Sequence, residues 1–220
     1  VCFSSPFDAT AVDFLETLDV PAYKIASFEC IDLPLIRRVA QTGKPMIIST
    51  GMASVAEIAQ AVDTALAHGC KDLVLLKCTT SYPASPENTH LRTIPHMRDL
   101  FHCPVGLSDH TMGLGAAVAA TALGAVVIEK HFTLTRAMKG TDHAFSLEPQ
   151  GMQKLVRDID RAQLALGDGV KGTYPSEVAP LKKMRKSIFY TKNIAAGEVL
   201  TPAHVDFRSP GDGTPPYRVG

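Results

Sequence analysis

Two histidines in this chain are placed as a pair of metal ligands would be. His110 lies in the cluster Ser-Asp-His-Thr and His131 lies in the cluster Glu-Lys-His-Phe, and a short apolar run precedes each cluster. If the two runs are neighbouring parallel strands, both imidazoles lie just past the same strand ends and reach one point. Imidazole nitrogens are common ligands of divalent metals, so the pair predicts a metal site. The alternative for each histidine is a ring satisfied by local contacts.

Carboxylates near these histidines are candidates for moving a proton or orienting an imidazole. They are Glu129, Asp109 and Asp142, and the last of these lies in a Lys-Gly-Thr-Asp-His loop that can fold over the site. A structural role is the alternative for two of them, since Asp109 can cap a helix and Glu129 can pair with a lysine.

Lysines and small hydroxyls at corresponding positions point to an anionic ligand. Lys24, Lys77 and Lys130 each lie in an apolar run, where a lysine needs an anionic partner. Together they predict a cationic pocket for phosphate or carboxylate, but Lys130 and His131 are adjacent and face one space only if the strand ends between them. The alternative is a lysine that pairs with a local acid. Hydroxyls that suit phosphate oxygens also follow the runs; they are Ser5, Ser27, Ser49, Thr50, Thr79, Thr80 and Ser108.

The side chains named above follow strands and helices that recur in a repeated pattern. Six short apolar runs each end in a polar cluster, and a helical stretch follows; the runs are 1–4, 22–26, 46–48, 73–76, 104–107 and 126–128. Continuous apolar runs are typical of parallel strands buried on both faces. The pattern predicts a (β/α)₈ barrel, an α/β fold with its active site at the strand ends, of which about six of the eight strands are present.

Helical periodicity and composition divide the chain further. Helices are expected at 9–18, 33–42, 55–68, 115–123 and 150–166. The partial barrel is assigned to residues 1–167, and a Gly- and Pro-containing linker with a basic cluster to 168–186. Short strands at 187–191 and 205–208 predict the start of a small β-rich domain over 187–220.

Composition excludes several classes of protein. The 22 basic and 22 acidic residues give no net attraction to nucleic acid or a membrane surface. No apolar stretch approaches the ~20 residues of a membrane span, and no secretory signal is present. The five cysteines show no CxxC pairing, which favours reduced thiols and a cytoplasmic location. The chain opens on Val1 within an apolar run and stops in a Pro- and Gly-rich turn, so we expect that both ends are cut.

Six motifs in this order resemble the sialic acid synthase family. They are Ser4-Ser-Pro-Phe7, Tyr23-Lys-Ile-Ala-Ser-Phe-Glu29, Ser49-Thr-Gly-Met52, Lys77-Cys-Thr-Thr-Ser-Tyr-Pro83, Gly106-Leu-Ser-Asp-His-Thr111 and Ile128-Glu-Lys-His-Phe132. Their spacing matches across nearly the whole chain. Within the family, the segments Phe145-Ser-Leu147 and Ala165-Leu-Gly-Asp-Gly169 are most similar to the pseudaminic acid branch.

The resemblance implies a reaction and a set of partners. Phosphoenolpyruvate would condense with 2,4-diacetamido-2,4,6-trideoxy-altrose, and phosphate would leave by C–O cleavage. The implied fold is a barrel followed by an antifreeze-like (SAF) domain, in a homodimer in which each SAF domain closes the partner's site. Neither nucleic acid nor membrane is an implied partner.

The resemblance also implies roles for single residues. By position, His110 and His131 would ligate the divalent metal, with Mn²⁺ expected and Mg²⁺ or Co²⁺ as alternatives. Glu129 and Asp142 match catalytic carboxylates, although a structural role for Glu129 stays open, and Arg208 loosely matches an arginine that reaches the sugar. The phosphoenolpyruvate ligands would be Ser5, Lys24, Ser27, Ser49, Thr80 and Ser108. The first barrel strands of the family carry a further glutamate and lysine, so we expect this piece alone to be poorly active.

Several other functions remain open at this point. The nearest is the same chemistry on N-acetylmannosamine or a legionaminic acid precursor, although Thr80 stands where the neuraminate branch carries an Asn. A metal-dependent pyruvate aldolase, or a Schiff-base aldolase that uses Lys24, Lys77 or Lys130, would release no phosphate. A sugar-binding or antifreeze-like module that is not an enzyme has support only from the carboxy-terminal segment.

Overall fold

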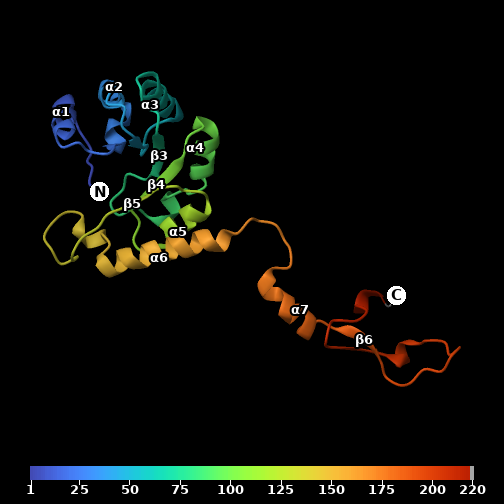
Figure 1. Ribbon diagram of the computed structural model, residues 1–220. Coiled ribbons are helices and arrows are strands. Elements are labelled where there is room, and N and C mark those ends of the chain that lie inside the picture. Colours follow the sequence, from blue (N-terminus) through green and yellow to red (C-terminus); the bar gives the residue numbers. More distant parts are fainter. Residues whose placement is uncertain (219–220) are drawn as a thin grey trace. The chain divides into compact units, whose positions relative to one another are not determined.

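The computed structural model describes residues 1–218 and separates into two compact units (Figure 1). The first unit is Val1–Gly167, and the second begins at Asp168. No helix in the described part of the chain is long and apolar enough to cross a bilayer.

The first unit is built on one parallel sheet whose five strands lie side by side in chain order. The strands are β1 (Tyr23–Ile25), β2 (Met46–Ser49), β3 (Leu73–Cys78), β4 (Val105–Asp109) and β5 (Ile128–Lys130). Each pairs with the next in parallel. Consecutive parallel strands in chain order are the pattern of a (β/α) barrel wall.

The prediction of a strand at residues 1–4, the first of the six apolar runs, is wrong. This segment makes a single bridge between Ser4 and Tyr23, in which the Lys24 N–H donates to the Ser4 carbonyl at 3.3 Å. Residues 1–4 are exposed, and Pro6 follows closely. Without burial on either face, and with a proline that lacks the N–H a ladder needs, the run has little to hold it as a strand.

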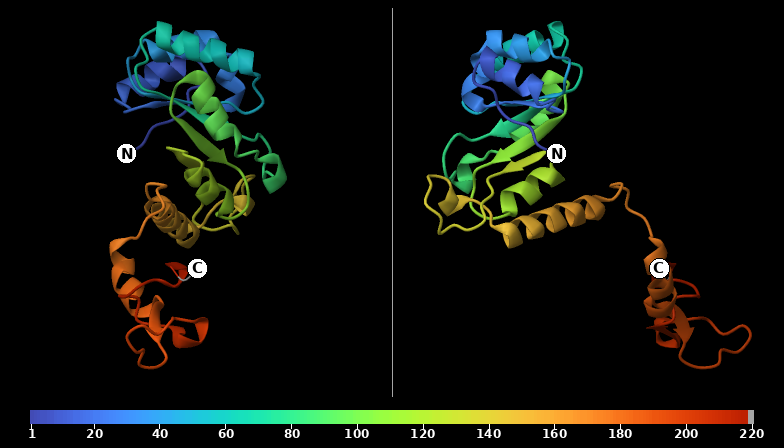
Figure 2. Two further views of the ribbon diagram at one scale, coloured as in Figure 1. Left: turned by 90° about the vertical axis from the view of Figure 1, so that its right-hand side faces the viewer. Right: turned by 60° about the vertical axis from the view of Figure 1, so that its left-hand side comes forward.

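The sheet is curled, as a half-barrel is (Figure 2). Lys24 Nζ on the first strand lies 3.1 Å from Glu129 Oε2 on the last strand, although β1 and β5 are not neighbours in the sheet. Side chains of a flat five-stranded sheet would not meet in this way, because neighbouring strands are about 4.8 Å apart. The curl therefore brings the inner faces of all five strands toward one space.

Helices follow the strands and lie around the outside of the sheet (Figure 1). They are α1 (Ala9–Thr17), α2 (Leu33–Ala40), α3 (Val55–Ala67), α4 (Thr93–Phe101), α5 (Gly115–Ala122) and α6 (Pro149–Leu166). All five expected helices of this unit are confirmed within two residues at each end. Helix α4 was not predicted; its Pro95 falls in the first turn, where a missing N–H costs no helical hydrogen bond.

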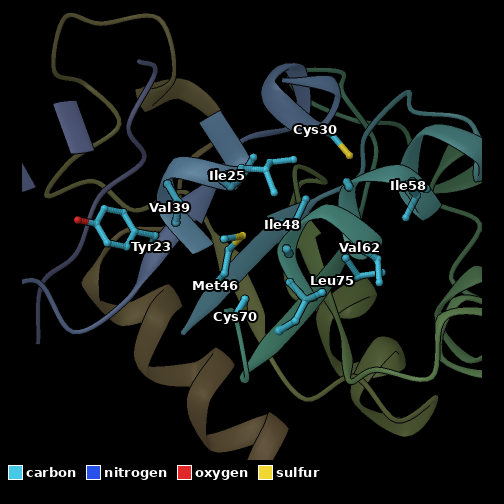
Figure 3. Close-up of a cluster of buried hydrophobic side chains, with 14 of the residues drawn as sticks. Tyr23, Ile25, Cys30, Val39, Met46, Ile48, Ile58, Val62, Cys70 and Leu75 are labelled. Carbon is cyan, nitrogen blue, oxygen red and sulfur yellow. The ribbon is translucent and has the colours of Figure 1, made fainter. Parts of the chain in front are cut away.

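The main core lies between the sheet and the outer helices (Figure 3). Alternate strand residues supply one side of it, including Tyr23, Ile25 and Ile48, and helix residues such as Val39 and Val62 supply the other. Because side chains alternate along a strand, the residues between these point to the concave face. That face holds the polar residues of the predicted site, and it includes Lys24 and Ser49.

The second unit contains a helix and a two-stranded antiparallel sheet. Strands β6 (Ser187–Tyr190) and β7 (Val205–Arg208) pair in the register Ser187 with Arg208, so both short strands expected here are present. Helix α7 (Val178–Met184) forms within the segment that composition assigned to a linker.

Candidate active site

The pattern of inward and outward side chains on β4 and β5 decides which residues reach the concave face. Ser108 Oγ donates to Glu129 Oε1 at 2.6 Å, so these cross-strand neighbours point the same way. Asp109 and Lys130 follow and meet each other, with Nζ to Oδ2 at 2.6 Å. Since neighbours on a strand face opposite sides, His110 and the residue after Lys130 return to the side of Ser108 and Glu129.

The two histidines are in contact at the ends of these strands. The ring centroids of His110 and His131 are 5.2 Å apart, with planes at 72°. His110 Nδ1 lies 2.8 Å from the Thr79 carbonyl, so in the neutral ring the proton is on Nδ1 and the Nε2 lone pair is available. His131 Nδ1 lies 3.6 Å from Asp142 Oδ2, which shows that the loop carrying Asp142 does fold back to this site.

Burial and neighbouring groups shift the pKa values of the two imidazoles in opposite directions. For His110, burial lowers the pKa, but hydrogen bonds with the Cys78 thiol and the Thr79 carbonyl outweigh burial, and the pKa is raised. For His131, burial and the neighbouring His110 lower the pKa despite Asp142. A lowered pKa favours the neutral imidazole that a metal requires.

The residues fit a metal site in which the protein supplies two imidazoles. A ligating histidine is commonly oriented by a carbonyl or carboxylate on its other nitrogen, and the Thr79 carbonyl holds His110 in this way. Across residues 1–218, no three His, Cys, Asp or Glu side chains gather tightly enough to hold an ion alone. The remaining ligands of an ion here would be water or substrate oxygens, as in an open catalytic site.

A second group of residues forms a polar cradle beside the histidines. Ser49 Oγ and Thr80 Oγ1 are buried without a hydrogen-bond partner, which is costly unless a ligand supplies one. Two residues after Ser49 the chain turns at Gly51, which has φ +42°. A Cβ added to Gly51 would lie 2.5 Å from Ser27 Cβ and 2.7 Å from Thr80 Oγ1. The loop after β2 can approach Ser27 and Thr80 this closely only because residue 51 is glycine.

Of the three strand lysines, one faces the concave side. Lys24 pairs with Glu129 there. Lys77 pairs in register with Leu107 of the helix-facing core and donates to Thr79 Oγ1 at 2.5 Å, while burial lowers its pKa. Lys130 forms an ion pair with Asp109. The expected pocket of three lysines is therefore wrong, because side-chain alternation turns two of them toward the helices.

Several side chains that line the site were not predicted from the sequence. Tyr82 stacks against His110 with ring centroids 4.2 Å apart, and Phe145 lies 5.0 Å from His131. The thiol of Cys78 accepts from Ser27 Oγ at 3.4 Å and lies 3.9 Å from His110 Nδ1. The position of Cys78 one residue after Lys77 was a usable signal, since only one of the two can face inward.

Ser5 takes part in none of the hydrogen bonds and ion pairs described for this group, and Arg208 lies outside the first unit. Ser5 is half-buried in the loop after the Ser4 bridge. Arg208 belongs to the second unit, where its Nε donates to Asp206 Oδ2 at 2.6 Å on an exposed surface. Contacts join seven of the others in two sets. Lys24 and Ser108 both meet Glu129, while Ser27 is linked through Cys78 to His110, which contacts His131, and His131 lies beside Asp142.

Comparison with known proteins assigns this arrangement to a family. Residues 1–171, which hold the whole half-barrel and both histidines, match the model of the NeuB family. The chain belongs to the NeuB family.

The relatives of this chain include proteins named as legionaminic acid and pseudaminic acid synthases. N,N'-diacetyllegionaminic acid synthase of Campylobacter jejuni is 41% identical, over 96% of this chain and 64% of that protein. Pseudaminic acid synthase of Helicobacter pylori is 38% identical, over 97% of this chain and 63% of that protein. The chain thus spans less than two thirds of the length of these relatives.

A solved structure agrees with the half-barrel. The crystal structure of N-acetylneuraminic acid synthetase from Leptospira borgpetersenii is similar with a TM-score of 0.75 and 33% identity. The match covers 80% of this chain and 62% of that one. This NeuB-family likeness and the curled five-stranded sheet support the barrel class expected from the sequence.

Proposed function

We propose that the protein is a nonulosonic acid synthase that condenses phosphoenolpyruvate with an open-chain amino sugar. The observation that carries the proposal is the joining of a histidine pair to a polar cradle with orphaned hydroxyls, on the concave face of a NeuB-family half-barrel. C3 of phosphoenolpyruvate bonds to the sugar aldehyde carbon, water adds at C2, and the C2–O bond to phosphate breaks. The products are a nine-carbon α-keto acid and phosphate.

The cradle residues are suited to hold the anionic substrate. Lys24 supplies a positive charge, and the Ser49 and Thr80 hydroxyls supply neutral hydrogen bonds. We include Ser5, Ser27 and Ser108 among the ligands by family resemblance. Glu129 holds both Lys24 and the Ser108 hydroxyl, so it sets where two of these groups sit before substrate arrives.

The histidine pair is suited to a divalent ion, for which we propose Mn²⁺, with Mg²⁺ or Co²⁺ as alternatives. His110 and His131 would hold it, and the ion would supply Lewis-acid polarisation of the sugar aldehyde. Asp142, beside His131, is placed to accept a hydrogen bond or a proton from the sugar or the water. The Tyr82 and Phe145 rings would limit the access of bulk water to the histidines.

For the sugar we propose 2,4-diacetamido-2,4,6-trideoxy-altrose, which makes the product pseudaminic acid. The motifs of the pseudaminic acid branch support this choice. The legionaminic acid precursor is the second candidate, because a legionaminic acid synthase is 41% identical. We also propose a cytoplasmic homodimer in which the partner's SAF domain, with Arg208, closes the barrel.

Phosphate release tests the proposal. The full-length protein is supplied with phosphoenolpyruvate and Mn²⁺, and the altrose derivative, the legionaminic acid precursor and N-acetylmannosamine are offered in parallel, with product masses read by mass spectrometry. Release with the altrose derivative alone supports pseudaminic acid synthesis, and release with another sugar alone reassigns the substrate. If no sugar gives release while pyruvate gives product, the protein is an aldolase and the proposal is wrong.

A further inference from the structure

A buried ion pair lies behind the histidines, on the opposite face of the sheet. Lys130 Nζ is 2.6 Å from Asp109 Oδ2, and the two side chains are 3% and 1% exposed. Asp109 and Lys130 are also cross-strand partners in the register of β4 and β5. The pair therefore links the two strands that carry the histidines, and it does so one residue before each ring.

The hydrogen bonds of this pair extend to the residue after His110. The Thr111 N–H and Oγ1 donate to Asp109 Oδ1 at 2.9 and 2.8 Å. Lys130 Nζ donates to the Thr111 carbonyl at 2.5 Å. We name Asp109, Thr111 and Lys130 the clasp. Its members hold the backbone on both sides of His110 and directly before His131.

Other contacts complete the fixing of the two rings. The His110 carbonyl accepts from the Ala84 N–H at 2.9 Å, and its ring is held by Thr79. The His131 carbonyl accepts from the Leu147 N–H at 2.8 Å. These contacts tie each histidine to its own surroundings. The clasp ties the backbone directly beside one histidine to the backbone directly beside the other, and the Ser108–Glu129 hydrogen bond links the same strands one residue earlier on the concave face.

Stability alone is a weak reason for such a pair. Replacing a buried ion pair by well-packed apolar residues is often neutral or stabilising, because both charges must be taken out of water. What apolar residues cannot supply is directional bonding that fixes register. We propose that the clasp is a positioning device that sets the His110 and His131 imidazoles at the separation one divalent ion requires. This inference rests on the proposed function, and it assigns Lys130 to positioning instead of to substrate binding.

The test compares Mn²⁺ affinity in three variants of the full-length protein. D109L/K130M removes both charges, T111V removes one hydroxyl donor with little change of shape, and H110A removes a proposed ligand. Free Mn²⁺ is measured by electron paramagnetic resonance, and folding is measured by circular dichroism and thermal melting. Loss of groups that orient metal ligands typically weakens metal affinity about 10- to 100-fold. We expect a loss in this range for D109L/K130M, a smaller loss for T111V, and no binding by H110A.

A second readout separates positioning from a general loss of structure. In the metal-free protein, histidine ring NMR signals of His110 and His131 should move in D109L/K130M, while those of His68, just after α3, and His96, on α4, should not. Unchanged Mn²⁺ affinity in D109L/K130M and T111V, with binding still lost in H110A, overturns the inference and leaves the proposed function standing. No Mn²⁺ binding by the unsubstituted protein overturns the metal part of both. If D109L/K130M does not fold, the T111V affinity and ring signals decide alone.

Discussion

Three residues on the concave face, Ser49, Gly51 and Thr80, shape the cradle beside the histidines. Ser49 and Thr80 keep hydroxyls without partners, and Gly51 allows the chain to pass between Ser27 and Thr80. A buried hydroxyl without a hydrogen-bond partner costs free energy, and a bound phosphate or carboxylate would offset this cost by accepting a hydrogen bond. This arrangement agrees with the anion site that we propose for the cradle.

Gly51→Ala should damage this cradle specifically. The added methyl group would overlap Ser27 and Thr80, and φ +42° is unfavourable for alanine. A displacement of about 1 Å in a positioned site can lower the rate about 10²-fold, so we expect a loss of that order in kcat/KM for phosphoenolpyruvate. Steady-state phosphate release measures it. The matched control is Gly43→Ala, which has φ +72° but no atom within 4 Å of the added Cβ. Equal losses in both variants would show that backbone strain, and not the cradle, is responsible.

At the scale of elements, sequence periodicity predicted most of the strands and helices but not which side chains meet. Strand runs and helix stripes are local patterns, so β1 to β5 and every α-helix of the first unit except α4 were visible in advance. The curl that joins Lys24 to Glu129 depends on the twist of the whole sheet. The alternation of side chains along a strand would have predicted that Lys77 and Lys130 face away from the site. This prediction requires the exact end of each strand, which the sequence does not show. Tyr82 was missed because its contact with His110 joins two different loops.

Tyr23→Phe should loosen the attachment of α1 to β1. The Tyr23 hydroxyl is buried and donates to Glu16 Oε1 at 2.7 Å, and this bond lowers the pKa of Glu16 below its ordinary 4.5. Loss of the bond should reduce the free energy of unfolding by about 1 kcal/mol at pH 7, measured by urea titration.

The same hydrogen bond predicts a pH dependence. A carboxyl with a lowered pKa in the folded state stabilises the protein above its unfolded pKa, and this stability is lost as the pH falls through the folded value. The difference between the wild type and Tyr23→Phe should therefore shrink as the pH is lowered below about 4.5. Val20→Ala, a truncation in the same core without a titrating partner, serves as the control whose difference should stay constant. A Tyr23→Phe difference that does not change over this range would contradict the role of Glu16.

At the scale of the whole chain, the division at Gly167 predicts where a protease acts first. Residues 168–174 are exposed and contain neither helix nor strand, and Gly167 and Gly169 both have positive φ. Local opening is easiest where few buried contacts hold the backbone, so trypsin should cut first at Lys171 or at the exposed lysines of α7. Lys24, Lys77 and Lys130 are buried and should resist. Mass spectrometry of an early time point should show a fragment whose carboxy-terminal end lies between residues 171 and 186, and which retains the sheet and both histidines. Lys139, in the exposed loop before Asp142, serves as the internal comparison. Cleavage at Lys139 at the same rate as at Lys171 would mean that this loop opens as readily as the segment between the units. The contact of Asp142 with His131 would then not hold the loop in place.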